Sequence, residues 1–156
     1  MVETALESFE SWLAGTYRGD ATYERVELLR EPGTPLGDLC VRLHVVNKSY
    51  YEVRVLLDRA EVQAGFSTEH RMVNEELEEM VLDQGGDLDD LLADELSELD
   101  VEPLHMDHFW ERPAFRFTVR LPLSSPDALD DATFRQRVRA VLKASHILFQ
   151  GCVDEA

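Results

Sequence analysis

Three residues beyond the middle of the chain are of types that bind metal ions in proteins. His105, Asp107 and His108 fall within four positions, and imidazole and carboxylate groups are common ligands of zinc and similar metals. Because side chains alternate along a β-strand, His105 and Asp107 would share one face and His108 would point to the other. A single metal ion would therefore need further ligands from a neighbouring strand or helix. The alternative is that all three are ordinary strand and turn residues.

Closely spaced carboxylates form a second candidate site in residues 87–90, followed by Asp94 and Glu95. An EF-hand calcium loop counted from residue 87 would place Glu98 at its twelfth position, where glutamate is required. Its sixth position, however, is Leu92 rather than the glycine that the sharp turn needs. The sequence therefore favours a capped helix with a solvent-exposed acidic face.

Nucleophilic and cofactor chemistry has little support. Cys40 and Cys152 are far apart and have no sequence-local histidine partner, and no Gly-x-Ser-x-Gly elbow is present. Gly-x-Gly-x-x-Gly and Gly-x-x-x-x-Gly-Lys-Ser/Thr motifs are absent as well. We predict no catalytic residue and no cofactor, and we expect both cysteines to be free thiols in a reducing cytoplasm.

Cationic side chains recur at two kinds of spacing. Arg135, Arg139 and Lys143 lie four residues apart, so they form a stripe along one side of a helix. The predicted outward strand positions add a basic sheet face made of Arg42, Arg54, Arg116 and Arg120. These cations could meet an acidic ligand or partner. We favour pairing within the protein or across a dimer, because its own middle third is strongly acidic.

Length and charge bound the function further. The 156 residues suit a single domain, 1–156. The net charge of −17 disfavours nucleic acid and anionic membrane surfaces as partners. Residues 61–110 hold sixteen acids and one base, whereas the flanking segments are nearly neutral. The N-terminus lacks the pattern of a signal peptide, and no run approaches the ~18 apolar residues of a membrane span; we expect a cytoplasmic protein.

Periodicity predicts an α+β fold in the order α-β-β-β-α-α-β-β-α. Apolar spacing near 3.6 marks helices and alternation marks strands. Four helices are predicted. The first covers 2–14, the second runs from a cap at Ser67 or Thr68 to Gly85, the third runs from a cap at Asp87 to Leu99, and the fourth covers 126–150 between a Ser125 cap and Gly151. The predicted strands are 23–30, 39–46, 50–57 with an extension to Gln63, 104–109 and 114–121.

Each predicted strand has one apolar and one polar face. This pattern indicates one mostly antiparallel sheet with helices packed on one face. The predicted core unites the apolar strand faces with the last helix, namely Val41, Leu43, Val53, Val55, Phe115, Phe117 and Val119 under Val138, Val141, Leu142 and Leu148.

This order of elements resembles the type III secretion chaperone-like fold. Within it, the chain resembles the YbjN-type family of bacterial sensory transduction regulators. The stretches that carry the resemblance are residues 65–69, the acidic run 85–96, and the hairpin through Phe109, Phe115 and Phe117. The resemblance implies a homodimer and the binding of another polypeptide, with no active site to transfer.

Two functional hypotheses follow. The leading one is a non-enzymatic, chaperone-like or regulatory module that binds another protein through the acidic middle third, with Asp90, Asp94 and Glu98 facing the partner. The alternative is a metal-binding sensor or metal-dependent enzyme that uses His105, Asp107 and His108.

Overall fold

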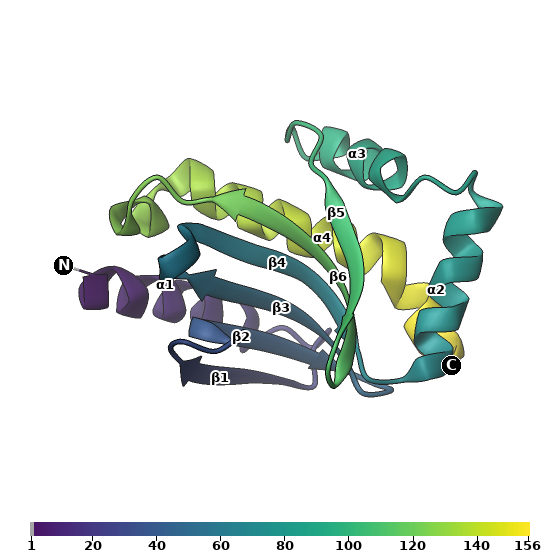
Figure 1. The fold of residues 1–156 in the computed structure, drawn as a ribbon, viewed down its shortest axis with the longest axis horizontal. Coiled ribbons are helices and arrows are strands. Elements are labelled where there is room, and N and C mark those ends of the chain that lie inside the picture. Colours follow the sequence, from purple (N-terminus) through teal and green to yellow (C-terminus); the bar gives the residue numbers. More distant parts are fainter. Residues whose placement is uncertain (1) are drawn as a thin grey trace.

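The computed structural model describes residues 2–156 and shows an α+β fold, as predicted (Figure 1). A six-stranded antiparallel sheet in the order β1-β2-β3-β4-β6-β5 is accompanied by four helices. Two short 3₁₀ helices, Leu57–Arg59 and Pro126–Asp130, lie in the connections between longer elements. The elements in chain order are α1 Val2–Tyr17, β1 Arg25–Glu31, β2 Gly37–Val45, β3 Ser49–Leu56, β4 Glu61–Thr68, α2 Arg71–Asp83, α3 Leu88–Glu98, β5 Met106–Glu111, β6 Ala114–Pro122 and α4 Ala132–Glu155.

The first strand group has four members rather than the predicted three. The chain turns after β3 at Ala60, whose φ of 50° is left-handed, and returns as β4. The expected tail of β3 up to Gln63 is therefore wrong. β4 sits between β3 and β6, and a Cβ at Gly65 would lie 1.9 Å from the Phe117 carbonyl oxygen. Only a residue without a side chain fits there. Because glycine is neither apolar nor polar in the pattern, it weakens the apolar–polar alternation by which a strand is predicted.

Several helix ends also differ from the prediction, and α1 continues to Tyr17 rather than ending at residue 14. Ser67 and Thr68 close β4 instead of capping α2. Residues 126–130 form a 3₁₀ turn, and the Asp131 side chain caps α4 by accepting a hydrogen bond from the Phe134 N–H at 2.9 Å. Gly151 does not end this helix. The final turn continues because Val153 is fully buried in the core.

The core lies between one face of the sheet and the helices α1 and α4, which run behind it in Figure 1. Helix α1 contacts β2, and α4 contacts β3 and β4. The predicted core is confirmed almost throughout. Phe115 and Leu148 are only half-buried, whereas the other predicted core residues are buried: Val41, Leu43, Val53, Val55, Phe117, Val119, Val138, Val141 and Leu142.

The opposite sheet face is not the exposed basic surface that alternation suggests. Glu52 on β3 is 5% exposed, and its carboxylate lies 2.6 Å from Arg42, 2.6 Å from Arg116 and 3.3 Å from Arg54. Glu111 on β5 also reaches Arg54, at 2.9 Å, although two strands separate β5 from β3. Pairing within the protein is therefore confirmed for these arginines, but the partners Glu52 and Glu111 lie outside the acidic segment 61–110 that we expected to supply them. Arg54 and Arg116 are buried, and Arg42 is half-buried.

These contacts set the charge state of the central carboxylate. Burial alone would raise the pKa of Glu52, but Arg116, Arg54 and Arg42 outweigh it and hold that pKa below its usual value. The fourth predicted outward arginine, Arg120, stays exposed and lies 3.4 Å from Asp107.

Candidate functional site

The candidate site lies where α2, α3 and β5 meet, and it is built on the start of α3. The Asp87 side chain caps this helix as predicted, by accepting a hydrogen bond from the Asp90 N–H at 3.2 Å. One oxygen of Asp89 accepts a hydrogen bond from the backbone N–H of Met106 at 2.9 Å. The first turn of α3 is thereby tied to the first residue of β5.

His105 joins the same two elements. Its Nδ1 lies 2.7 Å from Asp89, and its Nε2 lies 2.8 Å from Asp107. These hydrogen bonds to Asp89 and Asp107 raise the pKa of His105, because both carboxylates favour the imidazolium. Burial would raise the pKa of Asp89, yet His105 and the Met106 N–H outweigh it and lower that pKa. The histidine therefore bridges two acids, and protonation of its ring strengthens both contacts.

The predicted metal ligands do not converge. Both ring nitrogens of His105 already face carboxylates, while His108 is directed to the other side of the strand. His108 Nε2 lies 2.9 Å from the Asn74 side-chain oxygen, and the His108 ring stacks on Phe117 at 4.0 Å. Partial desolvation in this contact lowers the pKa of His108. Within residues 2–156, no three histidine, cysteine or acidic side chains are grouped to hold a metal ion.

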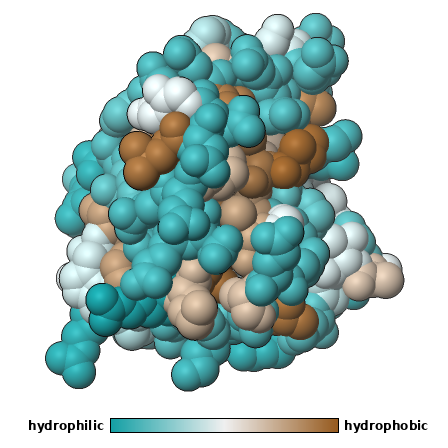
Figure 2. Space-filling view, turned by 90° about the vertical axis from the view of Figure 1, so that its right-hand side faces the viewer, coloured by the Kyte–Doolittle hydropathy of each residue, from teal (hydrophilic) through white to brown (hydrophobic). Residues whose placement is uncertain are grey.

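A groove of about 400 Å³ opens between these elements. Hydrophobic surface is visible between hydrophilic margins on the side of the molecule where α2 lies (Figure 2). Leu82, at the end of α2, is 72% exposed beside it. The groove is lined by the apolar side chains of Val81, Leu82, Leu88, Met106 and Phe117, together with Glu78, Asp87, Asp89, His105 and His108. It therefore combines an apolar interior with an acidic margin.

The predicted partner-facing acids lie further along α3, outside the groove lining. Asp90, Asp94 and Glu98 are all exposed, whereas Leu92 and Leu96 on the same helix are fully buried. Repulsion from Asp87 raises the pKa of Asp90, which shows how closely the carboxylates are packed here. We name the groove and these three acids together the acidic face.

Sequence reasoning missed the groove itself. Its apolar residues come from α2, α3, β5 and β6, so no single periodic pattern reveals it. One signal was present: Leu82 is an apolar residue outside the buried stripe of an otherwise acidic helix. Met72, in the first turn of the same helix, is also exposed, at 58%.

The two cysteines offer no activated nucleophile. Both are free thiols, and Cys40 is fully buried. Desolvation raises the pKa of both thiols, with nearby glutamates adding to the effect. Cys40 donates a weak hydrogen bond to Glu52 at 3.4 Å, which is a packing role.

Comparison with known proteins gives no relative for this chain. It matches no protein-family model, and neither a curated protein nor a solved structure is similar to it. No helix in residues 2–156 has the length and apolar character needed to cross a membrane.

Proposed function

We propose that this protein is a non-enzymatic module that binds another polypeptide, in a chaperone-like or regulatory role, through the acidic face. The carrying observation is a solvent-open apolar groove whose margin and adjoining helix surface are acidic. Asp90, Asp94 and Glu98 take no part in the ion pairs formed within residues 2–156, so they are free to meet a partner. We also propose membership of the YbjN-type family on the order of elements, and that membership would imply the same role.

The chemistry of the groove selects a basic segment that carries one or two large apolar side chains. Burying a leucine-sized side chain contributes ~1.5–3 kcal/mol, and the groove has the volume to accept one. Lysine or arginine residues flanking it would relieve repulsion among the carboxylates of α3. Each exposed pair contributes only ~0.2–1 kcal/mol, so charge would mainly set association rate and selectivity.

We also propose a homodimer in a reducing bacterial cytoplasm. β1 and β5 are the two edge strands of the sheet, and an unpaired edge is a ready surface for self-association. Light scattering is expected to give twice the chain mass of 17.8 kDa. A monomeric mass at micromolar concentration would contradict the dimer without touching the binding proposal.

A peptide titration tests the binding proposal. The probe is a fluorescein-labelled helical peptide of about 14 residues, with leucines along one face and lysines elsewhere. Replacing the three acids, as Asp90→Asn/Asp94→Asn/Glu98→Gln, is expected to weaken binding about tenfold. Raising salt from ~0.05 to ~0.5 M shortens the Debye length from about 14 to about 4 Å and is expected to slow association.

Two further variants separate apolar contact from charge. Leu82→Ser removes exposed apolar surface at the groove and is expected to weaken the same peptide about tenfold. The matched control, Asp58→Asn/Asp127→Asn/Glu155→Gln, neutralises three exposed acids elsewhere and is expected to change affinity less than twofold. Equal losses in the control and the acidic-face variant would show attraction by net charge alone and would refute the proposed site.

A further inference from the structure

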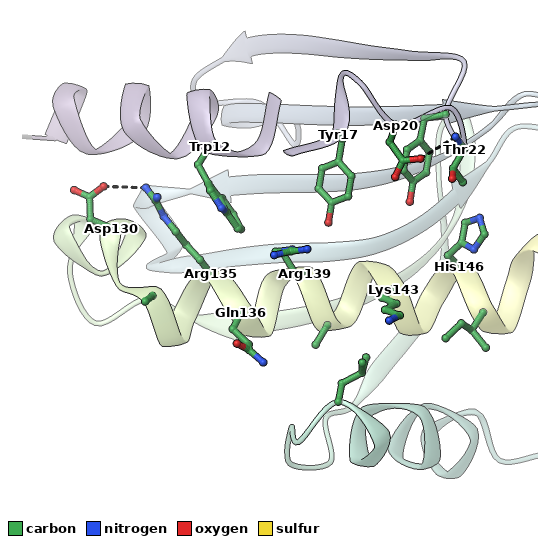
Figure 3. A pocket seen from close by; sticks show the side chains of 15 residues that line it. Trp12, Tyr17, Asp20, Thr22, Asp130, Arg135, Gln136, Arg139, Lys143 and His146 are labelled. Atoms are coloured by element: carbon green, nitrogen blue, oxygen red, sulfur yellow. Dashed lines mark hydrogen bonds and ion pairs between the residues drawn. The ribbon is translucent and has the colours of Figure 1, made fainter. Parts of the chain in front are cut away.

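A second, larger cleft of about 790 Å³ lies between α1, the loop that follows it, and α4 (Figure 3). Its chemistry is opposite to that of the acidic face. Trp12 and Tyr17 point from α1 toward α4, and Arg135 and Arg139 rise from α4 to meet them. Lys143 and His146 continue the α4 side of the cleft.

The cations of this cleft differ in whether they already have partners within the protein. Arg135 binds Asp130 at 3.0 Å, donates to Ser8 at 3.1 Å and lies over the Trp12 ring at 5.1 Å. Neither Arg139 nor Lys143 forms an ion pair within the part of the chain that the structure describes, and both are exposed. Arg139 and Lys143 are thus two cations on one side of α4 that a bound anion can reach, in a chain with a net charge of −17.

The inner end of the cleft is aromatic and holds an unused polar atom. The Tyr23 ring lies 6.2 Å from His146 and 5.7 Å from Tyr17. Burial raises the pKa of Tyr17, with the charge of Arg139 opposing the rise. His146 Nε2 is buried and has no hydrogen-bond partner, so a bound group could supply one.

We propose that the α1–α4 cleft binds a short, extended acidic polypeptide segment with carboxylates at alternate positions. Arg139 and Lys143 are four residues apart on α4, which separates them by about 6 Å along the helix axis. Side chains two residues apart on an extended strand are separated by about 6.7 Å. Two alternate carboxylates can thus meet the two free cations, while an intervening side chain packs against Trp12 and Tyr17.

Charge at the ends of the cleft limits the length of the ligand. Asp130 lies at one end and Asp20 at the other, so further carboxylates beyond the cationic part would be repelled. A nucleic acid carries a regular, long charge array, which the surrounding −17 disfavours. A brief acidic stretch in an otherwise neutral chain avoids this cost. No residue lines both this cleft and the acidic face, and their charges are opposite, although Leu99 at the end of α3 borders the cleft beside Glu98.

The test measures fluorescence anisotropy of a labelled peptide that alternates glutamate and serine. A second peptide with glutamine at each glutamate position is the ligand control. Arg139→Gln/Lys143→Gln is the site variant, and Lys48→Gln/Arg59→Gln is the matched control, since Lys48 and Arg59 are also exposed. Thermal melts establish that each variant is folded.

We expect the site variant to bind the glutamate peptide about tenfold more weakly than wild type, with less than a twofold change in the control variant. In a Trp110→Phe background, Trp12 is the sole tryptophan, and its emission is expected to shift on binding. Equal binding of the glutamine peptide, or tighter binding of a short oligothymidylate, would overturn the proposal. Self-association abolished by Arg139→Gln/Lys143→Gln would instead assign the cleft to a second copy of this chain, and it would overturn the proposal too.

Discussion

Glu52→Gln is expected to destabilise the protein strongly, because it removes the charge at the centre of a buried arginine cluster. Glu52 is 5% exposed and contacts Arg42, Arg54 and Arg116. The substitution keeps the size of the side chain but leaves Glu111 as the remaining carboxylate beside Arg54 and Arg116. Breaking a buried ion pair from one side typically costs about 3–5 kcal/mol, which for a chain of this length lowers Tm by about 6–20 °C.

The assay is urea unfolding followed by circular dichroism, with Glu27→Gln as the control. Glu27 lies on the same sheet face near Arg42, at 3.9 Å, but its side chain is 30% exposed. We expect the control to lose less than about 1 kcal/mol. A loss of that small size for Glu52→Gln would refute the reasoning, because it would mean that the arginines reach solvent or other acids.

The pH dependence supplies an independent check of the same cluster. The arginines hold the pKa of Glu52 below its usual value in the folded state. The stabilisation from Glu52 is therefore complete above the unfolded-state pKa of about 4.3, and it is lost as pH falls through the lower folded-state pKa. The stability gap between wild type and Glu52→Gln is expected to be constant near neutral pH and to shrink in strong acid.

Two further predictions concern the core and the histidines. Phe117→Ala removes a ring that is 1% exposed and packs on Phe149 at 5.0 Å; chemical unfolding is expected to show a loss of about 3–5 kcal/mol, and a loss below about 1 kcal/mol would invert the assignment of the sheet faces. In an NMR pH titration, the midpoint of His105 is expected above about 6.5 and those of His108 and His146 below it; Asp89→Asn should lower the His105 midpoint, and an unchanged midpoint would disprove the carboxylate bridge.

Local patterns predicted the elements that have strong local signals. Phe117 and Val119 alternate with polar residues, so the buried face of β6 follows from a period of two. Asp87 was identifiable as a cap because it precedes a regular leucine pattern. β4 was not predicted because Gly65 interrupts its pattern. The glycine is needed there because the Phe117 backbone on β6 lies too close for a Cβ, and the sequence of β4 alone does not show this. The true cap of α4 is Asp131, and the earlier Ser125-Pro126 pair imitates the same signal.

The buried arginine cluster and the groove depend on contacts between residues far apart in the sequence, so local patterns did not predict them. Arg54 and Arg116 occupy polar positions of alternating strands, which usually face solvent, and only the paired sheet brings Glu52 between them. The acidic surface of α3 was predictable from its charges. The adjoining groove was not, because its lining residues, among them Leu82 and Met106, come from four separate elements of the chain.

The central claim is that the acidic face binds a basic, apolar polypeptide segment, and backbone amide NMR during a titration tests it most directly. With the lysine–leucine peptide added to the labelled full chain, shift changes are expected to concentrate in residues 71–83, 88–98 and 105–111, with Leu82, Leu88 and Met106 among the largest. The predicted core residues of β2 and β3 should change little. Changes confined to residues 132–147, or spread evenly over the surface, would contradict the claim.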